Sequence, residues 1–564
     1  MKKKIVPVVI AILLIILTIA IGFGTGIMEK YSYSSERADL YEYFGITKQG
    51  ETAILLQDEV VEEKAIPENG TYYLPLSFVK DEINERFYYD YKEDLLLYSF
   101  PTETITVALT DTSYTKEGNA VELGYPIVLR QEEAVYVAVD YVKAFANFSY
   151  EAFEGPSRLQ IRTQWGEKRV AYIKKNTQVR LKGGVKSEIL FDVAAGEEVT
   201  VLETMENWSK VKTANGIIGY VENKRLRDEQ TVSETPVADV AEPVYTSLTK
   251  DYKINMVWNL VTNTTANGNV DELLANTKGI NTISPTWFAL SDNNGNISSL
   301  ADASYVSRMH ERGIEVWAMF DNFTNKEVST AEVIAYTSKR TSLIQNLMNQ
   351  VQANGIDGIN LDFEQIPQDS ADDYIQFIRE LSIACRNQGI VFSIDNYVPT
   401  GYTEHYNRQE QGIVADYVII MGYDEHWLGS DEIGSVASID FVENGIADTV
   451  SVVPKEKVIN ALPFYTILWG AGEEVTSTAM GMKRAEEFLA EKGVGGEWDE
   501  TTCQNYVTYT EEGITYHMWL EDERSIETKL NVMKNYDIGG VSGWRLGFEK
   551  EAVWDKIAAF VQGE

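Results

Sequence analysis

The chain has 564 residues, with 49 basic and 86 acidic side chains and a formal net charge of −37 at pH 7. So acidic a protein repels a phosphate backbone, which excludes nucleic acid as a partner. Two cysteines, Cys385 and Cys503, are too few for a disulfide framework. Solubility alone explains the acidity, although an acidic surface would also avoid the anionic polymers of a bacterial wall and leave uncharged sugar faces as partners.

The first segment is Met1-Lys2-Lys3-Lys4 followed by an almost uninterrupted apolar run over residues 5–27. A run of this length can span a bilayer of about 30 Å as a helix. The alternative is a cleaved signal peptide, but its apolar core would be shorter, and only Gly22-Phe23-Gly24 resembles a cleavage site. The lysines place the N-terminus in the cytoplasm by the positive-inside rule. We therefore expect residues 1–28 to be an uncleaved anchor with the rest of the chain outside the membrane, in a Gram-positive bacterium.

Two similar segments follow, roughly sixty residues apart. Residues 73–79 precede an aromatic strand at 87–90, and residues 136–142 precede a strand at 148–151. This repeat resembles the two-repeat α+β domain called copper amine oxidase N-terminal-like, and we assign residues 45–165 to it. The segment has no histidine, so we predict no copper site.

Residues 177–226 contain closely spaced short strands, for example Glu198-Val199-Thr200-Val201-Leu202 and Gly219-Tyr220-Val221. They resemble the bacterial SH3-like domain, a small β-barrel that binds peptidoglycan or acts as a spacer, over residues 168–227. Residues 228–243 combine Ser, Thr, Pro, Val and acids without an aromatic side chain. This composition predicts a linker over residues 228–248.

From residue 254 onward, short apolar runs alternate with helix-length stretches, which is typical of repeated βα units. The eight candidate strands are residues 254–261, 282–288, 315–320, 358–363, 391–395, 417–421, 458–462 and 540–544. Eight strands in roughly 310 residues fit an α/β fold, a (β/α)8 TIM barrel with one insertion, over residues 249–564. The insertion, at about 470–535, has a helix signal at 478–492 and a hairpin around Glu512-Gly513. We expect a small α+β subdomain that forms one wall of a groove.

The candidate chemistry lies in residues 357–364, Asp-Gly-Ile-Asn-Leu-Asp-Phe-Glu. In an extended strand, Asn360, Asp362 and Glu364 share one face. Asp362 and Glu364 would lie about 6.6 Å apart along the strand. At the carboxyl mouth of a barrel, such a pair suits general acid catalysis with an orienting partner. Exposed strands also alternate acids for no catalytic reason, so the spacing alone leaves both interpretations open.

The octet resembles the Asp-x-x-Asp-x-Asp-x-Glu signature of glycoside hydrolase family 18, which contains chitinases and endo-N-acetylglucosaminidases. Asn360 is the one departure from it. Three later segments are similar to strands of the same family, in the same order: Tyr417-Val418-Ile419-Ile420-Met421-Gly422-Tyr423-Asp424, residues 458–465 and residues 539–547. Asn360 and the segment His517-Met518-Trp519-Leu520 resemble the spore-cortex and cell-wall N-acetylglucosaminidase branch.

The resemblance implies a retaining mechanism in which the substrate assists. Glu364 would protonate the glycosidic oxygen and later activate water. Asp362 would bind the acetamido N–H of the oxazolinium ion, and Tyr423 the acetamido oxygen. Trp544 would form the apolar floor under the sugar. The residues expected to contact substrate besides these are Asn360, Met421, Asp424 and Trp427.

Three further expectations concern the same region. Asp357 differs from Asp362 in strand parity, so we treat it as structural support. Asn360 should donate a hydrogen bond to Asp362 and keep that carboxylate ionised. His426 has no metal-ligand spacing around it, and we expect neither a metal nor a cofactor.

The sequence leaves the glycan open. A membrane-anchored, monomeric enzyme that cleaves next to N-acetylglucosamine in peptidoglycan fits the modules and the family branch. Chitin or another glycan with a 2-acetamido group would use the same residues, by attack within the chain or at its end. A non-catalytic wall-binding protein on the same barrel is the alternative from another class, but Glu364, Asp362 and Tyr423 are all present and favour an enzyme.

Overall fold

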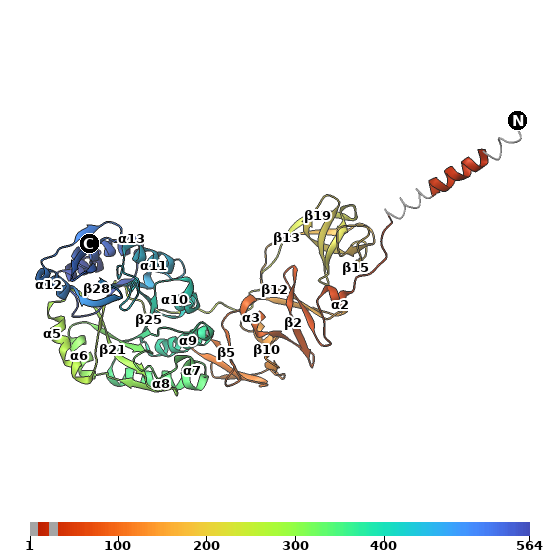
Figure 1. Cartoon of the computed structure of the whole chain (residues 1–564). Coiled ribbons are helices and arrows are strands. Elements are labelled where there is room, and N and C mark those ends of the chain that lie inside the picture. The colour runs from red at the N-terminus through yellow and green to blue at the C-terminus, as the bar shows by residue number, and fades with distance from the viewer. Residues whose placement is uncertain (1–8, 22–31, 564) are drawn as a thin grey trace. The chain divides into compact units, whose positions relative to one another are not determined.

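The structure is a computed structural model that describes residues 9–21 and 32–563. Its contacts divide the chain into two compact units. Figure 1 shows the whole chain, coloured by residue number. The smaller unit comprises Met1–Phe87, Val107–Tyr114 and Ala120–Glu242. The larger unit comprises Tyr88–Thr106, Thr115–Asn119 and Pro243–Glu564.

The first described segment, residues 9–21, is a helix with exposed apolar side chains, such as Leu13 and Ile15. Within the described residues, no helix is both long and apolar enough to cross a membrane. The predicted anchor, residues 1–28, falls outside the described residues at 1–8 and 22–28.

The smaller unit contains a sheet of seven strands in the order β11-β12-β1-β2-β3-β10-β9. In chain order its strands are β1 (Thr52–Leu56), β2 (Glu59–Glu68), β3 (Thr71–Pro75), β9 (Val128–Gln131), β10 (Ala134–Ala138), β11 (Ser149–Phe153) and β12 (Arg158–Arg162). Helix α2 (Leu40–Tyr43) precedes this sheet, α3 (Leu76–Glu82) follows β3, and α4 (Val139–Lys143) follows β10. A two-stranded sheet of β7 (Ser113–Lys116) and β8 (Asn119–Glu122) lies between β6 and β9 in the chain.

A second seven-stranded sheet follows in the same unit, in the order β15-β14-β18-β17-β16-β13-β19. Its strands are β13 (Glu167–Ile173), β14 (Thr177–Arg180), β15 (Ile189–Val193), β16 (Glu198–Thr204), β17 (Trp208–Thr213), β18 (Ile218–Glu222) and β19 (Leu226–Ser233). Alternate valines, among them Val199, Val201 and Val211, fill its core. Strand β19 extends into the predicted linker, and residues 234–253 contain neither helix nor strand.

The larger unit is built on a closed barrel of eight parallel strands, as predicted, because β20 pairs with both β33 and β21. The strands are β20 (Ile254–Asn259), β21 (Thr282–Leu290), β23 (Glu315–Asp321), β24 (Gly358–Asp362), β25 (Val391–Tyr397), β26 (Tyr417–Met421), β27 (Val458–Pro463) and β33 (Gly540–Trp544). A short strand, β22 (Ile297–Ser299), pairs with β21. The barrel therefore confirms the predicted fold class of this part of the chain.

Strand alternation sorts the barrel side chains into two cores. In β24, Ile359 and Leu361 join the apolar core shared with the surrounding helices. The inner core includes Trp258, Trp317 and Ile419. The helices are α5 (Val270–Leu273), α6 (Ala303–Glu311), α7 (Thr330–Ile334), α8 (Thr337–Asn354), α9 (Ala371–Gln388), α10 (Arg408–Val414), α11 (Ile439–Val450), α13 (Glu523–Tyr536) and α14 (Val553–Gln562).

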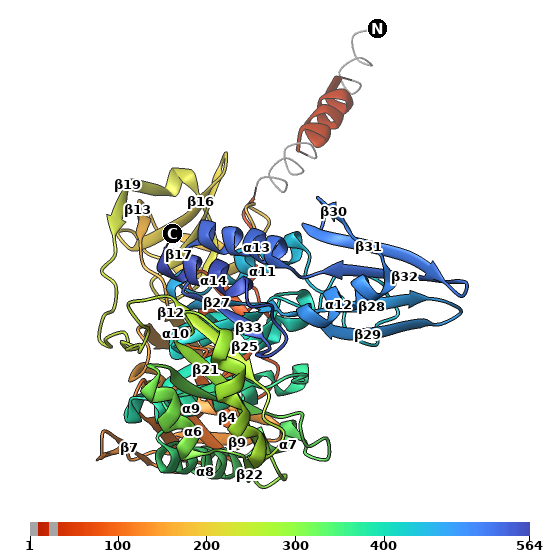
Figure 2. The ribbon, with the colours of Figure 1, turned by 90° about the vertical axis from the view of Figure 1, so that its left-hand side faces the viewer.

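Between β27 and α13 the chain forms an antiparallel sheet in the order β29-β28-β32-β31-β30. Its elements are β28 (Tyr465–Ala471), β29 (Val475–Gly481), α12 (Met482–Lys492), β30 (Glu497–Asp499), β31 (Gln504–Glu511) and β32 (Ile514–Leu520). Figure 2 shows this inserted sheet extending away from the barrel strands. It ends at Leu520, before the predicted boundary near residue 535, because α13 is a helix of the barrel that packs against α11 and α14.

A three-stranded sheet of β4 (Phe87–Asp90), β5 (Leu95–Ser99) and β6 (Thr104–Ala108) also contributes to the larger unit. Asp90 Oδ2 accepts hydrogen bonds from the backbone N–H and the hydroxyl of Thr337, at the start of α8. The Tyr88 hydroxyl donates to Asp373 of α9 at 2.6 Å. Residues assigned to the two-repeat domain by sequence thus hold two helices of the barrel.

Candidate functional site

A cavity of about 840 Å³ lies at the carboxyl ends of the barrel strands, the face on which such barrels carry their active sites. Its walls come from the segments after β24, β25, β26 and β33 and from the start of β28. The residues that line it include Glu364, Tyr397, Tyr423, Asp424, Trp427, Tyr465 and Trp544. Five of these seven were predicted from sequence.

Three aspartates form one row on adjacent strands beneath the cavity. Asp321 of β23 is the register partner of Asp362 on β24. Leu361 pairs with Ile394, so one step further along both strands brings Asp362 beside Asp395, about 4.8 Å away between strands. Burial raises the pKa of Asp362 well above its usual range, and the charges of Asp395, Glu364 and Asp321 raise it further.

Glu364 lies one layer above this row, directly after β24. The Tyr397 hydroxyl donates to its Oε2 at 2.7 Å. Asn322 holds its backbone, since Asn322 Oδ1 accepts from the Glu364 N–H and Asn322 Nδ2 donates to the Glu364 carbonyl. Burial raises the pKa of Glu364, the charges of Asp424 and Asp321 add to the rise, and the Tyr397 hydrogen bond opposes it. Glu364 is thus a fixed carboxyl group that retains its proton to higher pH than a free one.

Tyr423 and Asp424 follow β26, which is two strands from β24 in the barrel. The ring of Tyr423 lies 6.3 Å from that of Tyr465, and burial raises its pKa well above the usual range, helped by the charge of Asp362. The Tyr465 hydroxyl donates to Asp424. Burial also raises the pKa of Asp424, against the effect of that hydrogen bond. A phenol and a second carboxyl group therefore line the same cavity as Glu364.

The predicted sugar-contacting aromatics differ in exposure. Trp544, at the end of β33, lines the cavity with its ring 5.8 Å from the ring of Trp258. Trp427 is 57% exposed and lines the rim. Met421 is only 8% exposed and is not among the residues that line the cavity.

Asn360 departs from both expectations placed on it. Its side chain is completely buried below the aspartate row, so it does not reach the cavity as a substrate ligand. Its Nδ2 donates to Asp395 Oδ1 at 2.8 Å and to the Ser393 hydroxyl, and no described hydrogen bond joins it to Asp362. The prediction of an Asn360–Asp362 hydrogen bond is therefore wrong. The reason is the register between β24 and β25, which places Ser393 directly beside Asn360.

Asp357 lies before β24, away from the cavity. Its Oδ2 accepts from the Val316 N–H at 2.8 Å and contacts His310 Nε2 at 2.7 Å. These bonds tie β24 to its neighbouring strand, the supporting role expected from its parity.

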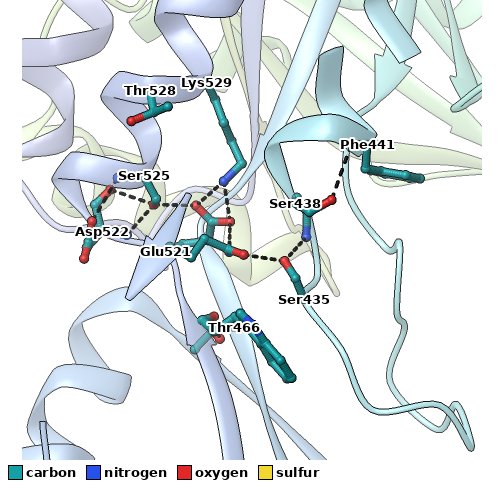
Figure 3. Close-up of polar contacts among 12 residues, drawn as sticks. Ser435, Ser438, Phe441, Thr466, Glu521, Asp522, Ser525, Thr528 and Lys529 are labelled. Atoms are coloured by element: carbon teal, nitrogen blue, oxygen red, sulfur yellow. Dashed lines mark hydrogen bonds and ion pairs between the residues drawn. The ribbon is translucent and has the colours of Figure 1, made fainter. Parts of the chain in front are cut away.

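The loop after β26 is fastened to the inserted sheet by a buried polar network. Lys529 of α13 pairs with Glu521 at 2.9 Å, and both side chains are essentially inaccessible. Gln504 donates to Glu521, and Ser435 donates to Gln504. Figure 3 shows Lys529 and Ser525 meeting at Glu521, with Ser435 on the facing segment. The network thus fixes the return of the loop that carries Asp424 and Trp427.

Sequence reasoning missed four residues of this region: Asp321, Asp395, Tyr397 and Tyr465. Asp395 and Tyr397 alternate along β25 as Asp362 and Glu364 do along the neighbouring segment, which was the available signal. Within the residues that the structure describes, no group of three or more His, Cys, Asp or Glu side chains could hold a metal ion. His426 instead contacts the Ser435 carbonyl through Nδ1 at 2.8 Å.

Comparisons with known proteins identify two parts of the chain. The model of the family "Glycosyl hydrolases family 18" matches residues 246–549, more than half of the chain, and that of "Bacterial SH3 domain" matches residues 175–227. "Putative sporulation-specific glycosylase YdhD" of Bacillus subtilis (strain 168) is 28% identical over 268 residues, 45% of this chain and 63% of that protein. "Cortical fragment-lytic enzyme" of Bacillus anthracis is 25% identical over 247 residues, 40% of this chain and 54% of that protein.

The chain therefore spans less than two thirds of the length of these two relatives. Among solved structures, the C-terminal domain of "putative chitinase" from Desulfitobacterium hafniense DCB-2 shares the fold with a TM-score of 0.50 and 17% identity. That likeness covers 56% of this chain and 99% of the other. The closed barrel, the acidic row beneath its mouth and the match over residues 246–549 lead to one assignment. The chain belongs to the glycosyl hydrolases family 18.

Proposed function

We propose that this protein is a glycoside hydrolase that cleaves β-1,4 bonds next to N-acetylglucosamine by a retaining, substrate-assisted mechanism. The observation that carries the proposal is Glu364, which lines the cavity, accepts the Tyr397 hydrogen bond and has a raised pKa. A carboxyl group with a raised pKa keeps its proton to higher pH, so it can protonate a leaving group and then act as a base.

In this mechanism Glu364 gives its proton to the glycosidic oxygen as the bond to the anomeric carbon breaks. The carbonyl oxygen of the substrate's own 2-acetamido group forms the new bond to that carbon, giving an oxazolinium ion. Asp362 accepts the acetamido N–H and stabilises the positive charge, and Tyr423 donates to the acetamido oxygen before it attacks. Water, deprotonated by the Glu364 carboxylate, then opens the ring with retained configuration, while Trp544 supports the sugar.

We assign peptidoglycan as the glycan. Three observations support it: one relative is named for lysing cortical fragments, another is named as a sporulation-specific glycosylase, and the chain carries a bacterial SH3 domain. Chitin has the same 2-acetamido chemistry, so the choice between the two is a matter of experiment.

The test uses the chain from Ser32 to its end, incubated with purified peptidoglycan and with chitin oligomers. Mass spectrometry should find fragments ending in N-acetylglucosamine, released faster from peptidoglycan than from chitin. Proton NMR should show the β-anomer as the first product. Faster release from chitin would make chitin the assigned substrate. Absence of product from both glycans would contradict the proposed activity. Glu364→Gln is the control for contaminating hydrolases.

We further propose that the N-terminal segment anchors the protein, with the barrel outside the membrane. The exposed apolar side chains of residues 9–21 and the three lysines before them support this placement. The protein should remain with the membrane fraction, and protease added to cells stripped of their wall should digest the barrel. A mature chain beginning near Tyr31 in the culture medium would contradict an anchor.

A further inference from the structure

One carboxyl oxygen of Asp395 accepts a hydrogen bond, and the other has no hydrogen-bond partner. Its Oδ1 accepts from Asn360 Nδ2 at 2.8 Å, whereas its Oδ2 is buried without a hydrogen-bond partner. Asp362 Oδ1 is also buried without a partner. The two side chains are neighbours across β24 and β25 by register. Each of these neighbouring carboxyl groups therefore has one buried oxygen without a hydrogen-bond donor.

The neighbours of the Asn360 side chain determine which end of its amide is the oxygen and which is the nitrogen. Trp258 Nε1 can only donate, and it lies 2.8 Å from Asn360 Oδ1, which also accepts from the Ser284 hydroxyl. Asn360 Nδ2 must therefore face Asp395, and Asp395 Oδ1 must accept. Any proton held by Asp395 consequently lies on Oδ2, which is buried without a partner.

We propose that Asp395 is a positioning residue whose Oδ2 shares one proton with the carboxyl group of Asp362. The pair then bears one negative charge. Two carboxylates this close would repel each other, so the singly charged pair is favoured. Asn360, two residues before Asp362 on β24, is a neutral amide, so the neighbouring strand β25 supplies the second carboxyl group.

The surroundings agree with a retained proton. Burial raises the pKa of Asp395 well above its usual range and the charge of Glu364 adds to the rise, while the Asn360 hydrogen bond opposes it. The other titratable groups that face the pair are Asp321 on β23, Tyr423 after β26, Tyr374 on α9 and Tyr406 before α10. The positive charge of the Arg408 guanidinium in turn opposes the rise in the pKa of Tyr374 that burial causes.

This inference rests on the proposed function only for its kinetic consequence. Asp395→Asn keeps the acceptor for Asn360 and places a permanent N–H donor beside Asp362, so it mimics the protonated residue and should fold. It should retain kcat within about threefold. Asp395→Ala removes the donor and should lower kcat at least about tenfold, with little change in KM.

The direct test is infrared spectroscopy of the protein from Ser32 onward between pH 5 and pH 9. The difference between wild type and Asp395→Asn should contain the carbonyl band of a protonated carboxyl group, which disappears as the pH rises. In an Asp362→Asn background the band should disappear at a pH lower by at least about one unit, because the like charge is gone. Absence of the band, or a band insensitive to Asp362→Asn, would overturn the shared proton. Unchanged kcat in Asp395→Ala would overturn the positioning role.

A second readout needs no substrate. A carboxyl group whose pKa is higher in the folded than in the unfolded protein stabilises the fold at low pH. This contribution is lost as the pH rises from the unfolded-state pKa to the folded-state pKa. The melting temperature of wild type relative to Asp395→Asn should therefore fall with rising pH, and a constant difference would contradict the proposal. If wild type cleaves neither glycan while the infrared band is present, the proposed function fails and the shared proton stands.

Discussion

Removal of the Tyr397 hydroxyl should change the pH at which the enzyme loses activity. Tyr397 donates to Glu364 Oε2 at 2.7 Å and lowers the pKa of that residue against the effect of burial. A hydrogen bond to a charged group contributes about 1.5–3 kcal/mol, and 1.36 kcal/mol corresponds to about one pKa unit. Because water can enter part of the space left by the hydroxyl, we expect Tyr397→Phe to raise the pKa of Glu364 by about one unit.

The sign follows from the role of Glu364 as an acid. Activity requires its protonated form, so the alkaline limb of the kcat/KM profile reports its pKa in the free enzyme. That limb should move upward by about one pH unit in Tyr397→Phe. The matched control is Tyr406→Phe, because the Tyr406 hydroxyl accepts from the Ile366 backbone rather than donating to Glu364. An unmoved limb in Tyr397→Phe, or an equal shift in Tyr406→Phe, would refute the reasoning.

Three further predictions concern stability and binding. Lys529→Met leaves Glu521 buried and unpaired, so urea unfolding should show a loss of about 3–5 kcal/mol, and the double variant with Glu521→Gln should lose less. Trp427→Ala, at the cavity rim, should raise KM by about two- to tenfold with little change in kcat, whereas Tyr402→Ala, 93% exposed and outside the cavity lining, should leave KM unchanged. Asp90→Ala removes the acceptor at the start of α8 and should lower the free energy of unfolding by about 0.5–2 kcal/mol. A fragment beginning at Pro243 lacks β4 and β5 and should melt at a lower temperature than the chain from Ser32. Equal melting temperatures would contradict the docking of this sheet.

The barrel could be predicted from sequence because its strands are short apolar runs bounded by polar segments. Strand parity also placed Asp362 and Glu364 on one face. The relation between neighbouring strands could not be read in the same way, since a register shift of one residue would turn Asp395 and Tyr397 outward. Asn360 was therefore expected to donate to Asp362, although its side chain donates to Asp395 on the neighbouring strand.

Long-range docking was equally hidden in the sequence. The repeat around residues 73–90 favoured a separate domain over 45–165, but Tyr88 and Asp90 form hydrogen bonds with helices that begin more than two hundred residues later. The end of the insertion was placed too late because residues 523–536 are amphipathic and fit either the inserted sheet or the barrel. Only their contacts with α11 and α14 decide between the two.

The most direct test of the account is Glu364→Gln in the chain from Ser32 onward. The amide cannot donate an acidic proton or act as a base, while the shape of the cavity is kept. Turnover of N-acetylglucosamine-containing glycan should fall by at least about a thousandfold, while binding of an oligomer, measured by calorimetry, should stay within a few fold. Turnover near the wild-type rate in Glu364→Gln would contradict the assignment of catalysis to this residue.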